Sequence, residues 1–293
     1  MKKLGKNEET TGLQERTYFI TPLQGTISFL FVLLVWLLLG PWMVVLVQPL
    51  SNAYLTANAP FLAMALGLVT VRTTILHTSF TALVTDRPRF RFPLFFTSAG
   101  IYFATNALFL VFSLLFDDAS YMRGSASGLS RLFILPLVLV LTPLQTSCEE
   151  LLFRVLVVRT ALHGRGPYVL KAKILASLLS AAFFMLPHLG NREVTAAQSQ
   201  GIVLLYYALF GFLVTYLCLQ AGGFEISLAV HAANNLFIAL VCNYPDSSLP
   251  SIPIWETTKP VGTMQDILQL TVSLAVVALF VRKSLSKPHS VQS

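Results

Sequence analysis

Charged residues are scarce in this chain, and acidic residues are the scarcest. Only 11% of its 293 residues are charged, with 20 lysines and arginines against 13 aspartates and glutamates, whereas 55% are hydrophobic. The mean hydropathy is +0.71. A water-soluble domain carries about 25% charged residues. The composition therefore excludes a soluble globular protein and predicts an integral membrane protein.

We expect neither a disulfide framework nor a separate polar domain nor a cleavable signal peptide in this chain. Its three cysteines lie in apolar segments without metal-ligand spacing, which indicates small buried side chains. The first apolar run starts late and is too long for a signal-peptide core. Basic loops beside an anionic membrane leaflet account for the net charge of +7, so no nucleic-acid partner is implied. The cysteines are Cys148, Cys218 and Cys242.

Apolar runs of the length that crosses a bilayer, roughly 20 residues of helix, recur along the whole chain. They predict an all-α fold, a polytopic membrane helix bundle with about eight transmembrane helices. The second run is the weakest because Arg72 and His77 interrupt it, and the fourth continues as helix toward residue 163. The predicted spans are 26–48, 59–83, 93–116, 131–150, 169–189, 202–220, 225–242 and 264–282.

Basic residues predict the orientation of this bundle, because cytoplasmic loops carry an excess of lysine and arginine. With the amino terminus in the cytoplasm, 15 of these residues fall on the inner side. We therefore expect a multi-pass protein with both termini cytoplasmic and the lipid bilayer as a partner. As a separate expectation, the membrane is a bacterial plasma membrane. Only four basic residues fall on the outer side: Arg123, Arg131, Arg192 and Lys259.

Two adjacent glutamates, Glu149 and Glu150, stand inside an otherwise apolar stretch, whereas the other acidic residues lie in hydrophilic stretches or at the edges of apolar runs. A carboxylate at the centre of a bilayer helix costs about 2.5–3.5 kcal/mol to insert, which makes it a candidate for function. In a helix Glu150 and Arg154 are i and i+4, the spacing of an ion pair. Glu149 is turned about 100° away and is expected to have no partner. The alternative is an ionic staple between helices.

Two of the five histidines share this apolar context. His188 follows Pro187 at the end of the fifth predicted span, and His231 and Asn235 are i and i+4 in the seventh. One helix thus presents an imidazole and an amide on the same face. A lone intramembrane histidine usually bonds a neighbouring helix, but two of them with two glutamates and an asparagine indicate a site. The others are expected to be packed or solvated: His77, His163 and His289.

Such a set of side chains can activate water within a membrane. A glutamate and a histidine can share the removal of a proton from water, while a second histidine and an amide donate to an oxyanion. The same groups could hold a zinc ion, with Glu149, His188 and His231 as ligands and water at an open position. The sequence leaves both alternatives open. It contains no His-Glu-x-x-His motif, no mid-span aspartate and no Gly-x-Ser-x-Gly motif.

Three motifs of these residues resemble, in the same order, those of the CPBP family, which includes CAAX prenyl protease 2, bacteriocin-processing and abortive-infection-like proteins. The resemblance covers about residues 131–242 and implies an intramembrane endopeptidase. By this resemblance Glu149 and His188 activate water, His231 and Asn235 stabilise the oxyanion, and Glu150 and Arg154 orient the site. The motifs are Glu149-Glu150-x-x-x-Arg154, Phe184-x-x-x-His188 and His231-x-x-x-Asn235.

The resemblance also implies a substrate class and a division of the chain. The substrate is expected to be a membrane-associated protein or peptide, either prenylated at a CAAX terminus or bacteriocin-like, and zinc is the one candidate cofactor. Two other classes stay open: a non-enzymatic immunity or regulatory scaffold of the same fold, and a proton-coupled transporter, although no inverted repeat is visible. We divide the chain into a cytoplasmic tail (1–25), N-terminal transmembrane helices (26–128), a CPBP-like catalytic membrane core (129–245), and an extramembrane loop, last transmembrane helix and tail (246–293).

The predicted spans pose one geometric difficulty. They place His188 near the outer end of the fifth helix and His231 nearer the inner end of the seventh. At a rise of 1.5 Å per residue, untilted helices would keep these two histidines apart. We expect helix tilting, a bend at Pro187 and a late start of the seventh helix after Gly222-Gly223 to bring them together.

Overall fold

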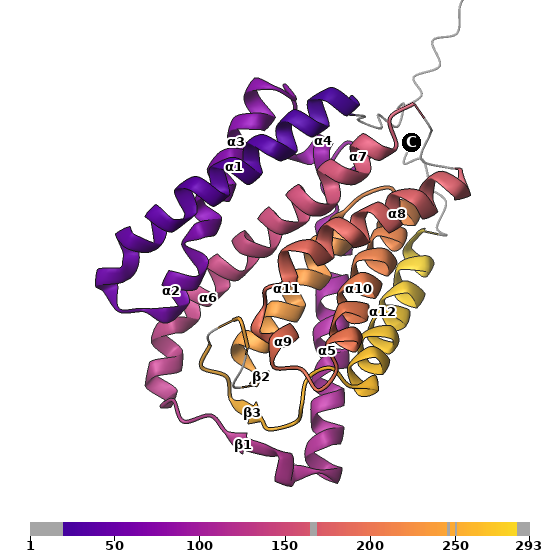
Figure 1. The fold of residues 1–293 in the computed structure, drawn as a ribbon. Helices are drawn as coiled ribbons and strands as arrows, with labels where there is room; N and C mark the ends of the chain where they lie inside the picture. Colours follow the sequence, from indigo (N-terminus) through magenta and orange to yellow (C-terminus); the bar gives the residue numbers. More distant parts are fainter. Residues whose placement is uncertain (1–19, 165–168, 245–246, 250, 286–293) are drawn as a thin grey trace, which may run out of the picture.

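The structure is a computed structural model that describes residues 20–164, 169–244, 247–249 and 251–285. Most of the predicted tail, 1–25, lies outside the described residues. The regular structure is almost entirely helical (Figure 1), so the predicted all-α helix bundle is confirmed. The main helices are α1 (Pro22–Val47), α2 (Ala53–Asn58), α3 (Pro60–Thr74), α4 (Phe80–Val84), α5 (Phe92–Phe116), α6 (Gly128–Glu149), α7 (Val157–Ala161), α8 (Leu170–Met185), α9 (Arg192–Thr195), α10 (Gln200–Ala221), α11 (Glu225–Leu240) and α12 (Met264–Leu285).

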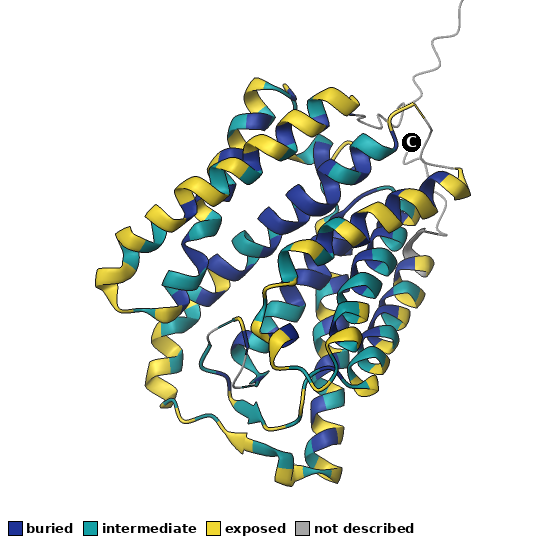
Figure 2. Ribbon diagram, viewed as in Figure 1, coloured by how far each residue is buried: buried dark blue, intermediate teal, exposed yellow. Residues whose placement is uncertain are grey.

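Seven helical stretches of the described chain are long and apolar enough to cross a membrane. The seventh predicted span, 225–242, corresponds to α11, which has only 16 residues, about 24 Å of helix, and is not among these seven stretches. Most of its residues are buried against other helices (Figure 2). Because protein covers α11, its length does not have to match the bilayer. The seven stretches are Pro22–Leu50, Ala53–Thr74, Phe92–Phe116, Gly128–Ala161, Leu170–His188, Gln200–Ala221 and Met264–Arg282.

The predicted second span, 59–83, is wrong in its second half. Helix α3 ends at Thr74, and His77 adopts a left-handed φ of 47° before the short helix α4 begins. The guanidinium of Arg72 closes this turn, since its Nη1 donates to the carbonyl oxygen of Thr78 at 2.9 Å. The charged side chain of Arg72, which is costly to expose to lipid, thus binds a backbone carbonyl where the helix ends.

Short polar residues mark the ends of several spans. Thr21 caps α1 through a capping box with Gln24, and Ser127 caps α6 by accepting from the backbone of Ser130. At its other end α10 stops at Gly222, whose φ of 68° is the left-handed geometry of a helix C-cap. These residues satisfy backbone groups that a helix leaves without partners, so the chain can turn between spans.

A long central helix divides the bundle into two parts (Figure 1). It consists of α6, the π-helical segment Glu150–Leu156 and α7. On one side α1 packs against α3, and on the other lie α5, α8, α10, α11 and α12. A small sheet covers one end, in which β3 (Trp255–Thr257) pairs antiparallel with β1 (Tyr121–Arg123) and parallel with β2 (Cys242–Asn243). The glutamates therefore lie at the centre of the molecule.

Side chains on the outer faces of the bundle are large and apolar, as lipid contact requires. On α1, Leu37 is 59% exposed and Trp42 is 66% exposed, and Figure 2 shows the same exposed colouring along the outside of the helix. The cysteines are free, with Cys148 and Cys218 buried and Cys242 half-buried. Apolar surface of this extent in water would cause aggregation, so the exposed faces agree with an integral membrane protein.

Substituting Gly211 by alanine is expected to destabilise the contact between α8 and α10. A Cβ atom at this position would lie 2.7 Å from Cα of Ala181, so the two backbones would have to separate, at a cost of about 1–3 kcal/mol. Thermal unfolding of the purified protein in detergent measures the loss. Gly201→Ala in the same helix is the control, because its Cβ meets only Ser199 Oγ at 3.9 Å. An equal Tm for both variants would contradict the prediction.

Candidate active site

Glu149 and Glu150 lie where the central helix changes type. Helix α6 ends at Glu149, and the next seven residues, Glu150–Leu156, are π-helical. Single π-helical turns inside α-helices occur frequently at functional sites. The predicted pair is confirmed: Arg154 Nη1 forms an ion pair with Glu150 Oε2, and both side chains are fully buried.

The imidazole of His231 lies between the two glutamates. Its Nδ1 is 2.8 Å from Glu150 Oε1, and its Nε2 is 3.4 Å from Glu149 Oε2. The expectation that Glu149 has no partner is therefore wrong, because α11 brings His231 to it. A carboxylate that accepts from Nδ1–H fixes the tautomer of a histidine and directs Nε2 to the opposite side. Nε2 of His231 thus faces Glu149.

Asn235 lies one turn after His231 on α11 and is oriented by neighbours that the sequence did not reveal. Tyr102 on α5 donates its hydroxyl to Asn234 Oδ1 (3.3 Å), and Asn234 Nδ2 donates to Asn235 Oδ1 (3.1 Å). In this arrangement the amide oxygen of Asn235 faces Asn234. The Nδ2 of Asn235 then remains a donor, with no acceptor among the residues that the structure describes.

His188 follows the end of α8, in a 3-10 turn that contains Pro187. Its Nδ1 is 2.7 Å from the carbonyl oxygen of Phe184, so Nδ1 carries the hydrogen and Nε2 is left free. The ring packs between those of Phe184 and Tyr207, with centroid distances of 4.8 and 4.3 Å. Phe184 also contacts the ring of His231 at 5.4 Å. The two histidines, which the predicted spans had kept apart, thus touch the same aromatic ring.

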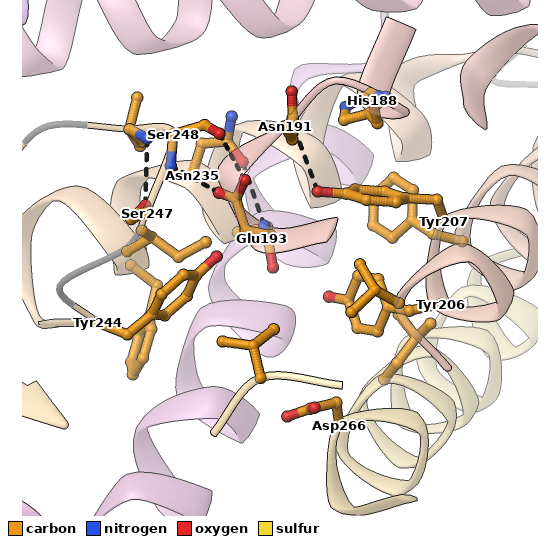
Figure 3. Close-up of a pocket in the computed structure, with 18 of the residues that line it drawn as sticks. His188, Asn191, Glu193, Tyr206, Tyr207, Asn235, Tyr244, Ser247, Ser248 and Asp266 are labelled. Carbon is orange, nitrogen blue, oxygen red and sulfur yellow. Dashed lines mark hydrogen bonds between the residues drawn. The ribbon is translucent and has the colours of Figure 1, made fainter. Parts of the chain in front are cut away.

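A cavity of about 560 Å³ connects these side chains, a volume typical of sites for small ligands or peptide segments. Of the six predicted site residues, four line the cavity: Glu149, His188, His231 and Asn235. The other two, Glu150 and Arg154, do not line it, although Glu150 contacts the lining residue His231. Figure 3 shows His188 and Asn235 at one side of this space. The cavity therefore has room for water and a peptide bond beside Glu149.

Further polar residues line the cavity and escaped sequence reasoning (Figure 3). Glu193 on α9 accepts from the backbone nitrogen of Ser248 at 2.9 Å and from its hydroxyl at 2.5 Å, which ties a connecting segment to α9. Lys259 forms a 3.0 Å ion pair with Asp117, and hydrogen bonds from Lys259 and Ser120 lower the pKa of the Asp117 carboxyl. Sequence spacing carries no signal for these contacts, which join segments far apart in the chain.

Glu149 and Glu150 are not the only acidic residues with buried side chains in the described part of the chain. Glu225, the first residue of α11, is fully buried and binds Arg91, with Nε–Oε1 and Nη2–Oε2 distances of 2.9 and 2.8 Å. In the sequence this residue stands at the edge of an apolar run. Neighbouring helices cover α11 as far as its first residue, so Glu225 is buried although it stands at the edge of the apolar run.

The zinc alternative has no assembled ligand set in this structure. No group of three or more histidine, cysteine, aspartate or glutamate side chains in the described part of the chain is placed to hold a metal ion. The proposed ligands Glu149, His188 and His231 are therefore not gathered around one point. The side chains present fit acid–base and hydrogen-bonding roles.

Comparison with known proteins adds independent evidence. Residues 129–237 match the model of a family described as type II CAAX prenyl endopeptidase Rce1-like. A protein of Bacillus subtilis (strain 168), named uncharacterized protein YyaK, is 28% identical over 249 residues, which cover 79% of this chain and 80% of the relative. No solved structure matches the chain. The matched segment begins in α6 and ends in α11, and it contains all six predicted site residues.

Proposed function

We propose that this chain cleaves a peptide bond within the membrane, and that the attacking nucleophile is a water molecule activated by Glu149. The family supports this reaction, since residues 129–237 match CAAX-type membrane endopeptidases of the CPBP family. The observation that carries this proposal is the imidazole of His231 held between two glutamates beside a cavity. A purely structural pair would need only Glu150 and Arg154. The second carboxylate, on the cavity side, suits proton transfer.

In the first step, water in the cavity is deprotonated and attacks the substrate carbonyl. The carboxylate of Glu149 takes the proton, and the free Nε2 of His188 orients the water by accepting its second hydrogen. The hydroxide adds to the carbonyl carbon, and its negative charge passes to the carbonyl oxygen. Glu149 then lies 3.4 Å from His231 Nε2, close enough for the proton to move to the imidazole.

In the second step, the tetrahedral intermediate is stabilised and breaks down. Asn235 Nδ2 and protonated His231 Nε2 donate hydrogen bonds to the oxyanion, as oxyanion holes do. Collapse breaks the carbon–nitrogen bond, and the proton on His231 Nε2 goes to the leaving amine. While His231 carries this proton, its positive charge is balanced by the Glu149 carboxylate that has given the proton up, and its Nδ1–H stays bonded to Glu150.

The substrate is proposed to be a membrane-associated protein or peptide, of prenylated CAAX type or bacteriocin-like. We also propose that both termini lie in the cytoplasm, as the distribution of basic residues predicts, and that the membrane is a bacterial plasma membrane. An immunity or regulatory scaffold that does no chemistry is the competing function, because it could keep the same fold with the same buried pairs.

Substituting Asn235 by alanine is expected to lower cleavage by about 10²–10³-fold, because one oxyanion donor is lost. Membranes from cells that express the wild type or the variant are compared by quantitative proteomics for peptides that only the active protein produces. A purified protein with such a peptide as substrate then gives the rate. A scaffold function predicts no difference between the two membranes, and that result would overturn the proposal.

A further inference from the structure

Arg154 lies behind the cavity in a socket made by α8 and α10. Its guanidinium stacks on the rings of Phe184 and Phe210, at 4.9 and 5.7 Å from their centroids. Its Nε donates to the hydroxyl of Thr215 at 2.9 Å, and this hydroxyl lies 2.9 Å from Ser180 Oγ. These three partners, and Ser180 behind them, belong to α8 and α10, which do not carry the glutamates. Contacts from outside the central helix therefore help to set the direction of the guanidinium, together with its ion pair to Glu150.

The socket depends on a close approach of α8 and α10. Thr215 is four residues after Gly211, and its hydroxyl also lies 2.6 Å from the Gly211 carbonyl oxygen. At Gly211 the backbone of α10 approaches Ala181, the neighbour of Ser180, too closely for a side chain. The missing side chain lets the hydroxyls of Ser180 and Thr215 meet. Both are fully buried, so no bulk water competes for Arg154 Nε.

We infer that Thr215, with Ser180, is a positioning residue for His231. The hydroxyl of Thr215 fixes the guanidinium of Arg154, the guanidinium fixes Glu150, and Glu150 holds the hydrogen of His231 on Nδ1. This chain of bonds keeps Nε2 unprotonated and directed at Glu149 before substrate binds. Neither hydroxyl belongs to the three motifs. The kinetic part of this inference rests on the proposed function, whereas the tautomer does not.

The full-length protein, labelled with nitrogen-15 histidine in detergent micelles, tests the inference by its imidazole NMR signals. His231→Gln identifies the signals of His231. We expect wild type and Thr215→Ser to hold His231 with the hydrogen on Nδ1, and Thr215→Val to mix the two tautomers. On a cleaved peptide, Thr215→Val is expected to lower kcat about 10–100-fold, the range for groups that orient reacting side chains, with KM unchanged and the rate restored in Thr215→Ser.

Two controls separate positioning from stability. Thr105→Val on α5 removes a half-buried hydroxyl that bonds only Ile101 of the same helix, and it should leave tautomer and kcat as in the wild type. Ser180→Ala is a second variant should Thr215→Val fail to fold, and it should shift the tautomer in the same direction. A His231 that keeps its hydrogen on Nδ1 in both variants overturns the inference. Absence of cleavage by the wild type would count against the proposed function alone, since the NMR result stands without it.

Discussion

Glu149→Gln is expected to reduce peptide-bond cleavage by about 10²–10⁴-fold while the protein remains folded and inserted. Glutamine keeps the size and hydrogen-bonding reach of the side chain but cannot accept a proton from water, and general base catalysis contributes a rate factor of this size. The carboxylate of Glu149 contacts His231 at 3.4 Å and forms a side-chain hydrogen bond with Gln145; an amide of the same size can occupy the same place, so little packing is lost. Initial rates on a cleaved peptide, with Tm from the same preparation, give both quantities.

The matched control is Glu256→Gln on β3, a glutamate outside the residues that line the cavity. It should cleave at the wild-type rate. Should Glu149→Gln retain more than about a tenth of the wild-type rate, a general base other than Glu149 would be required. A fall in both rate and Tm would instead return Glu149 to a structural role, the ionic staple between helices.

Arg154→Met is expected to cause the largest loss of stability, about 3–5 kcal/mol. Methionine fills much of the same space in the aromatic socket but leaves the carboxylate of Glu150 buried without a cation. Glu150 is fully buried, so water cannot replace the lost partner. Equilibrium unfolding in mixed micelles measures the change in free energy.

The double variant Glu150→Gln with Arg154→Met provides the control for this mechanism. It removes the buried charge together with its partner, and it is expected to recover part of the stability lost in Arg154→Met, because breaking a buried pair costs more than replacing it with neutral groups. Additive losses in the double variant would contradict the buried-charge explanation. They would point instead to the packing of Arg154 on Phe184 and Phe210.

Hydropathy predicted most of the fold because lipid permits few alternatives. A segment that crosses hydrocarbon must satisfy its own backbone, so long apolar runs become helices. The exception around His77 arose where Arg72 could reach a backbone carbonyl, a contact that a hydropathy average does not include. The orientation of the bundle and its division at residues 25, 128 and 245 stay predictions.

The candidate site was predictable in its parts and only partly in its arrangement. The pair of Glu150 and Arg154 follows from helix periodicity, since it is local. The contacts of His231 with both glutamates join residues about 80 positions apart, and no local spacing encodes them. The link between Glu193 and Ser248 spans 55 positions. Such contacts depend on how helices pack, which one sequence without relatives does not specify.

The number of residues in the π-helical segment Glu150–Leu156 determines how the side chains of the site are aligned. A π-turn holds one more residue than an α-turn, and each residue of an α-helix contributes about 100° of rotation. Losing one residue here and relaxing to an α-helix would rotate everything before the segment against everything after it. Glu149 and α7 would then face different neighbours, although every motif residue was still present. This chain can therefore tolerate substitutions at Leu151 more readily than it can tolerate a deletion there.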